Sequence, residues 1–147
     1  MAIMKKINLE GEKYNQLQEL TIRGVKIKGS LSPYDIPRQA TVSYDEKERE
    51  YKIHFIYLTP DEPKSEKKAS AEISLFLGQS SGKLYDIVIR GQAPGNLRNI
   101  QVELISKIAD LAQETERKTP LNYRKELNLL VAKKFLEENQ ELYSFAG

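Results

Sequence analysis

The sequence predicts an α+β domain in which an antiparallel sheet of about five strands, arranged as a meander, precedes two C-terminal helices that pack on one face of it. Before Gly91, short segments alternate apolar and polar residues, as half-buried strands do. After Gly95, apolar residues recur every three to four positions, as on amphipathic helices. This change of period divides the chain into a sheet region, residues 19–91, and a helical region, residues 96–139.

The composition indicates that residues 1–147 form a single domain. A chain of 147 residues has the usual size of a single domain, and 39% apolar with 30% charged residues is typical of a globular protein. No window approaches the roughly 18 uninterrupted apolar residues that a membrane helix needs. The chain has no cysteine, and no apolar stretch typical of an export signal follows Met1. We therefore expect a soluble cytoplasmic protein without a membrane partner.

The charge balance bears on nucleic-acid binding. The net charge is +2, from 23 basic and 21 acidic residues. Such a balance does not give the dense positive field that non-specific nucleic-acid binding usually needs. Nucleic acid is therefore a possible partner that the composition does not favour.

The first 18 residues admit two interpretations. Ile3, Ile7 and Leu9 fit an extra edge strand, whereas Tyr14 and Leu17 fit the start of a short helix. The sequence does not decide between them.

Residues 19–29 alternate apolar and polar side chains, but the phase slips in the middle. Apolar residues occupy even positions before Gly24 and odd positions after it. One strand with a β-bulge at Gly24 explains the slip, because one extra residue returns the apolar set to the same face. The alternative is two short strands joined by a turn.

Two hairpins follow. The first, residues 40–57, alternates on both sides of a charged turn at residues 45–50, and the second, residues 71–89, does so around a Gly- and Ser-rich turn at residues 78–82. The segment between them, residues 59–68, contains two prolines and mixed charge. Its composition predicts a mobile loop.

Two helices are predicted after the sheet region. Asn96 is a suitable N-cap for the first, which should run for about five turns. Thr119 and Pro120 are a suitable start for the second. The expected inner face of the first helix consists of Leu97, Ile100, Leu104, Ile108 and Leu111. The expected inner face of the second consists of Leu127, Leu130, Val131 and Phe135.

Catalytic motifs are weak in this sequence. His54 is the sole histidine, and in strand phase it points away from the apolar face, so we expect a structural or surface role. The segment from Gly78 to Lys83 resembles a phosphate loop but has the wrong spacing and leads into a strand, so we interpret it as a hairpin turn. No acidic or histidine spacing typical of a metal site occurs. We expect no metal and no other cofactor, and the balance is against an enzyme.

An anion site is conceivable where the sheet region meets the helical region. Backbone N–H groups at the start of a helix attract anions, and two arginines flank this segment. The residues concerned are Arg90, Gly91, Gly95, Asn96 and Arg98. A simple strand-to-helix corner explains the same glycines and is the favoured interpretation.

The strongest indication of function is a second apolar face on the sheet. Ile56, Phe76, Leu84 and Val88 lie out of phase with the core residues of their strands. Two helices can cover only one face, so this patch needs other cover. That cover is a second copy of the chain, a different protein, a ligand or the first twenty residues.

We therefore expect a non-catalytic binding domain that acts as a homodimer or as a subunit of a protein complex. The first alternative is a domain that binds single-stranded nucleic acid on a sheet face carrying Arg23, Lys26, Lys28 and Lys52. The second is an enzyme with a carboxylate or arginine site between sheet and helices.

Overall fold

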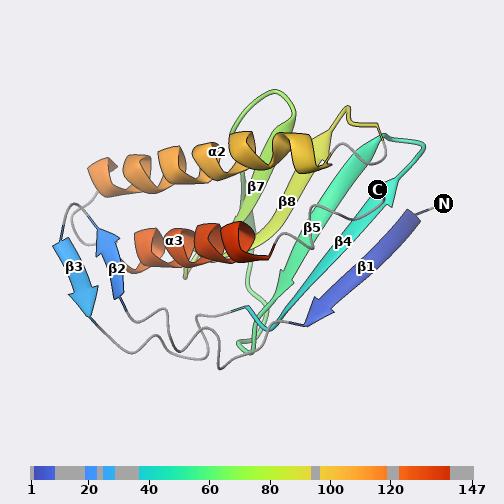
Figure 1. Cartoon of the computed structure of the whole chain (residues 1–147). Helices are drawn as coiled ribbons and strands as arrows, with labels where there is room; N and C mark the ends of the chain where they lie inside the picture. The colour runs from blue at the N-terminus through green and yellow to red at the C-terminus, as the bar shows by residue number, and fades with distance from the viewer. Residues whose placement is uncertain are drawn as a thin grey trace.

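Two layers dominate the structure: a six-stranded antiparallel sheet and a pair of helices that cover one of its faces (Figure 1). The structure is a computed structural model, and it describes residues 2–8, 19–22, 25–28, 37–93, 97–118 and 123–139. In spatial order, the sheet consists of β1 (Ala2–Asn8), β4 (Gln39–Asp45), β5 (Glu50–Ile56), β8 (Leu84–Arg90), β7 (Ile73–Gly78) and β6 (Lys64–Lys68). The other elements are a separate hairpin, β2 (Glu19–Ile22) with β3 (Val25–Lys28), and the helices α2 (Leu97–Lys118) and α3 (Tyr123–Glu138).

The predicted fold class is confirmed, as are both central hairpins, β4–β5 and β7–β8. The strand order departs from a simple meander at two points: β1 pairs with β4, past the separate β2–β3 hairpin, and β5 pairs with β8 and not with β6. Six of the seven residues of β8 are buried. A strand that is buried on both faces needs a central position, and the return of β8 to the middle of the sheet provides it.

The edge-strand interpretation of the N-terminus is the one that the structure supports. β1 pairs with β4, with Ile3 opposite Tyr44 and Ile7 opposite Ala40. β1 thus extends the sheet at its edge and covers neither face (Figure 1). The alternative helix start, residues 14–17, lies outside the described residues.

The single bulged strand predicted over residues 19–29 is wrong, and its alternative is correct. β2 and β3 form an antiparallel hairpin of their own. In the register of this hairpin, Leu20 pairs with Ile27 and Ile22 with Val25. A reversal of the chain moves the apolar phase just as a bulge would, which is why the sequence pattern did not separate the two.

The mobile loop predicted over residues 59–68 is wrong in its second half. Lys64–Lys68 form β6, the edge strand next to β7. Its charged residues looked like a loop in the sequence. Charged residues, lysine above all, also suit an edge strand because they discourage pairing with other chains.

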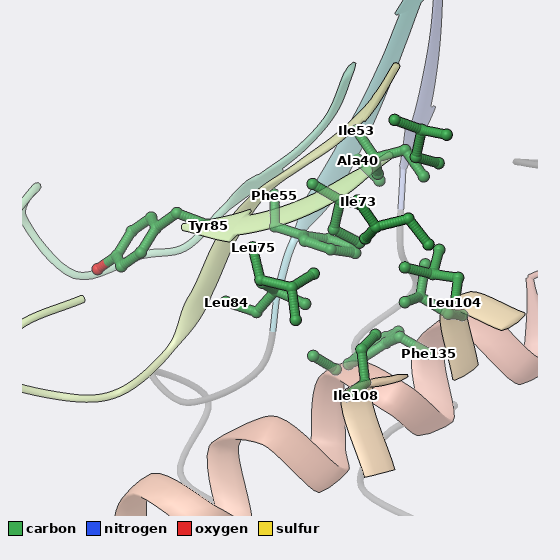
Figure 2. Close-up of a cluster of buried hydrophobic side chains, with 14 of the residues drawn as sticks. Ala40, Ile53, Phe55, Ile73, Leu75, Leu84, Tyr85, Leu104, Ile108 and Phe135 are labelled. Carbon is green, nitrogen blue, oxygen red and sulfur yellow. The ribbon is translucent and has the colours of Figure 1, made fainter. Parts of the chain in front are cut away.

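The core lies between the sheet and the helices (Figure 2). The predicted inner face of α2 is confirmed: all five of its apolar residues are buried. On α3, Val131 and Phe135 are buried as predicted, and Leu130 is partly buried. Burial also extends to residues that the prediction missed: Glu126, Asn128, Leu129, Ala132 and Leu136. The proposed caps Asn96, Thr119 and Pro120, and the side chain of Leu127, lie outside the described residues.

Candidate functional site

The face of the sheet opposite the helices, which we call the open face, is the candidate site. Residues directly opposite each other in paired strands share a face. His54 pairs with Asp86, and Asp86 with Phe76, so this row crosses three strands away from the core. By the same registers, the open face includes Thr41, Ser43, Glu50, Lys52, His54, Ile56, Glu66, Ser74, Phe76, Asp86, Val88 and Arg90.

Three of the four predicted interaction residues lie on this face. Ile56 is 38% exposed at the end of β5, Phe76 is half-buried, and Val88 is 7% exposed in the centre of the sheet. Leu58, which follows β5, is 54% exposed. The most exposed apolar residues of the open face therefore lie toward the end of β5. Whether these residues bind a partner stays a prediction.

The placement of Leu84 on the second face is wrong, and a β-bulge is the reason. Leu77 pairs with Leu84, yet the preceding residue Phe76 pairs with Asp86, so Tyr85 is an extra residue in β8. The bulge returns Leu84 to the core, beside Leu75 on the helix side of the sheet, while the buried ring of Tyr85 points away from these two leucines (Figure 2).

Arg90 also lies on the open face, where it is already paired. Its guanidinium donates to the hydroxyl of Ser74 at 2.7 Å and contacts the carboxylates of Glu66 at 3.5 Å and Glu50 at 3.7 Å. Two carboxylates neutralise this cation, which weakens the case for an anion site at this corner. Arg90 therefore does not lie between the sheet and the helices, where the enzyme alternative would need an arginine.

Of the other residues of the predicted anion site, the structure describes the surroundings of Gly91. Gly91 has a positive φ of 74°, as a tight corner requires, and its N–H donates to the carbonyl of Arg49. Gly95, Asn96 and the side chain of Arg98 lie outside the described residues.

The basic residues of the single-strand-binding alternative are divided between two sheets, as far as the structure describes them. Lys26 and Lys28 belong to the separate β2–β3 hairpin, whereas Lys52 lies in the main sheet. The sequence analysis placed these lysines on one face because it assumed a single continuous sheet. The β2–β3 hairpin is a separate sheet, so that assumption does not hold. Arg23 lies outside the described residues.

His54 and Asp86 form a close pair on the open face. His54 Nδ1 lies 2.6 Å from Asp86 Oδ1, and the Lys52 ammonium lies 3.8 Å from the same oxygen. The Asp86 side chain is only 12% exposed, and the His54 side chain is 43% exposed. A carboxylate oxygen accepts hydrogen bonds, so His54 Nδ1 is the donor to Asp86 in this pair.

A hollow of about 350 Å³ adjoins His54. It forms where β5 parts from β8: their pairing ends at His54 and Asp86, whereas β5 continues against β4 as far as Ile56. The Tyr85 bulge lies at the same point of β8. The residues that line the hollow are His54, Phe55, Ile56, Tyr57, Thr59, Asp61 and Tyr85.

Glu62 fastens the β7–β8 turn near this hollow. Its carboxylate accepts hydrogen bonds from the backbone N–H groups of Ser80 and Ser81, both at 3.0 Å. It also accepts from the hydroxyls of Ser81 at 2.9 Å and Tyr85 at 2.8 Å. Gly78 and Gly82 close the turn through the bond from Gly82 N–H to the Gly78 carbonyl. The segment is a hairpin turn, as predicted, and a carboxylate occupies its N–H groups.

These bonds set the protonation of both partners. Partial burial raises the pKa of Glu62, but the hydrogen bonds from Ser81, Tyr85 and Ser80 together outweigh it, so this pKa lies below its usual range. Burial and the hydrogen bond to Glu62 raise the pKa of Tyr85 to about 12. At neutral pH, Glu62 is therefore an anion and Tyr85 a donor.

Asp86, Glu62 and the hollow are the features that the sequence analysis missed. One feature of the sequence could have identified Asp86: it is an isolated acidic residue within the apolar run of β8. Glu62 was hidden in a segment interpreted as a loop. Within the described residues, no group of three or more histidines and carboxylates is placed to hold a metal ion. Neither described helix is long and apolar enough to cross a membrane.

Comparison of the chain with protein-family models, with curated proteins and with solved structures finds no significant match. The function therefore has to be argued from the residues of this chain. The open face and the adjoining hollow supply the features for that argument.

Proposed function

We propose that the protein is a non-catalytic interaction domain that binds another protein surface with its open face, as a homodimer or as a subunit of a complex. One observation carries the proposal: the helices cover one face of the sheet, while Ile56 and Phe76 present apolar surface on the other. A second copy of the chain is the simplest partner. We place the protein in the cytoplasm because it lacks cysteine.

The charges of the open face support docking. Arg90 is paired with Glu50 and Glu66, and Lys52 with Asp86. A partner that covers these groups would bury ion pairs and not isolated charges. Burial of an unpaired charge has the larger desolvation cost, and this surface avoids it. Both signs of charge occur on the face, as a two-fold symmetric interface requires of a surface that must complement itself.

Ile56→Glu tests the proposal without disturbing the core. Ile56 is 38% exposed, so the variant should fold, and a glutamate there should oppose burial of the face. Val102→Glu is the matched control, because Val102 is an 80% exposed apolar residue on α2.

The readout is solution mass by light scattering, at low and high salt. We expect the wild type and Val102→Glu to have twice the chain mass of 16.9 kDa, and Ile56→Glu to be monomeric. A monomeric wild type contradicts the homodimer, so that only a role as a subunit of a complex with another protein would remain. A dimer that survives Ile56→Glu contradicts the open face as the interface.

A further inference from the structure

We propose that the outer edge of β6 binds an extended, acidic segment of a partner protein, which adds to the sheet as a further antiparallel strand. The inference goes beyond the interaction proposed above, because it concerns the edge of the sheet and not its open face. It holds whether the protein is a monomer or a dimer.

Two hydrogen bonds establish which backbone groups of β6 face its neighbour β7. Gln79 N–H donates to the carbonyl of Pro63 just before β6, and Ala69 N–H donates to the carbonyl of Ile73 just after it, both at 2.9 Å. In an antiparallel pair of strands, hydrogen-bonded positions alternate with positions that are not bonded. Both pairs continue the β6–β7 register, so the odd-numbered residues of β6 are the ones that bond to β7.

The even-numbered residues of β6 direct their backbone groups to the other side. These residues are Lys64, Glu66 and Lys68, and their N–H and C=O groups lie along the outer edge of the strand. No strand among the described residues lies beyond β6. Groups on alternate residues have the spacing that an added strand needs. The edge can therefore form a ladder of main-chain hydrogen bonds with an extended segment.

The side chains along this edge leave an excess of positive charge. The Lys64 ammonium is paired with Asp61, and the Glu66 carboxylate contacts Arg90. Lys68 is exposed, and no ion pair among the described residues involves it. Because directly opposite residues of paired strands lie close together, a carboxylate opposite Lys68 on an added strand would attract its ammonium.

A hollow of about 110 Å³ between β6 and α2, the β6–α2 hollow, extends the positive charge to the helix side of the sheet. Its lining includes Lys67 and Lys107, with Asp110 as the acidic residue. Lys67 pairs with the core residue Leu75, so it lies on the face of the sheet that carries the core. A residue opposite Lys67 on an added strand would share that face. An acidic side chain there would meet more positive than negative charge.

The same charges disfavour other strands. Lysines on an edge discourage pairing with neutral or basic strands. A second copy of β6 is also unsuitable, because an antiparallel pair centred on Glu66 would oppose the two Glu66 residues to each other and Lys64 to Lys68. An acidic strand places opposite charge beside the lysines. The edge thus selects its partner by charge.

The probe is the peptide Glu-Glu-Thr-Val-Thr with an acetylated N-terminus and an amidated C-terminus. In the antiparallel arrangement, its first residue lies opposite Lys68, its second opposite Lys67 and its last opposite Lys64. The first, third and fifth residues then bond to the edge, so methylation of their backbone nitrogens should abolish binding. Methylation of the second and fourth nitrogens, which face away from the edge, is the matched control. The peptide Gln-Gln-Thr-Val-Thr tests the charge.

Two pairs of variants test the protein side. Lys68→Glu is compared with Lys47→Glu, which reverses the charge of an exposed lysine in the turn between β4 and β5. Glu66→Pro is compared with Glu66→Gln. Both remove the carboxylate, but only proline removes the outward N–H, and proline is tolerated in an edge strand where the N–H faces outward. Binding is followed by NMR, through the shifts and the solvent exchange of the backbone amides.

We expect the probe to bind with a millimolar dissociation constant, because a short peptide loses freedom when it is ordered. The amides of Lys64, Glu66 and Lys68 should exchange more slowly in the complex. Lys68→Glu and the glutamine peptide should each weaken binding about fivefold at low salt, whereas Lys47→Glu should leave it unchanged. Glu66→Pro should abolish binding, and Glu66→Gln should retain it.

Absence of binding at low salt, equal binding of the two methylated peptides, or equal effects of Lys68→Glu and Lys47→Glu would each overturn the inference. If Glu66→Pro does not fold, the two methylated peptides still test the backbone ladder on the wild type. Solution mass is measured on the same samples, so failure of the edge site is separated from failure of the homodimer.

Discussion

Glu62 and Asp86 are two carboxylates near Tyr85 that have different hydrogen-bond and ion-pair partners. Tyr85 connects them, because its hydroxyl donates to Glu62 and Asp86 follows it in β8. The donors to Glu62 are backbone N–H groups and hydroxyls, which stay protonated at neutral pH. The partners of Asp86 are an imidazole and a lysine that both reach solvent. The difference separates a carboxylate that holds the β7–β8 turn from one that pairs with two partly exposed side chains on the open face.

Glu62→Gln should have the largest effect on stability. An amide keeps one acceptor oxygen, and its NH2 group faces donors, so charge-assisted hydrogen bonds at the turn are lost. We expect the free energy of unfolding to fall by about 2 kcal/mol. Urea denaturation measures it, with Glu46→Gln in the exposed turn between β4 and β5 as control. A loss equal to that of the control would contradict the structural role of Glu62.

Asp86→Asn should cost less, about 1 kcal/mol, because its partners can turn to water. The same variant should change the ring signals of His54, since the amide no longer fixes the proton on Nδ1. Denaturation and NMR spectra check the two effects together. Unaltered His54 signals would show that Asp86 does not orient the ring.

Tyr85→Phe removes one donor to Glu62 and should cost about 1 kcal/mol or less at neutral pH. Its stronger signature lies at alkaline pH. The pKa of Tyr85 is raised to about 12 in the folded protein, against about 10 for an unfolded tyrosine. The contribution is thus complete below pH of about 10 and is lost as pH rises toward about 12. Thermal unfolding from neutral to alkaline pH should show this loss in the wild type and not in Tyr85→Phe.

The acid response of Glu62 is the smallest expected effect. Its folded-state pKa lies below the unfolded value, so its contribution is complete above the unfolded value of about 4.3 and is lost as pH falls through the folded one. Denaturant unfolding between neutral and acid pH should show a shallower decline for Glu62→Gln than for the wild type. Parallel declines would mean that Glu62 titrates alike in both states.

The sequence predicted what depends on neighbours along the chain. The two central hairpins and the buried stripe of α2 follow from local periodicity. The pairing of β5 with β8 does not, because His54 and Asp86 are 32 positions apart. The Tyr85 bulge lies in the β7–β8 hairpin, and it moved Leu84 from the expected surface into the core. The hollow is set by where two distant strands part, which no local pattern records.

The charged edge strand β6 shows a second reason why part of the structure could not be predicted from the sequence. Its residues, Lys-Ser-Glu-Lys-Lys, have the composition of a loop, and only their pairing with β7 makes them a strand. Glu62 comes shortly before it and was hidden for the same reason. The sequence showed the lone acid of β8 but not which of its neighbours would become its partner.

The central position of β8 has a consequence for how the chain folds. The β4–β5 hairpin is complete about thirty residues before β8 exists on a growing chain, but it cannot acquire its inner neighbour until β8 has been made. We expect β4–β5 and the β6–β8 meander to form as separate local units, with their joining as the slow step, because contacts distant in sequence form late. Until then the inner edge of β5 is unpaired, and it is the point at which a nascent chain is most exposed to mispairing.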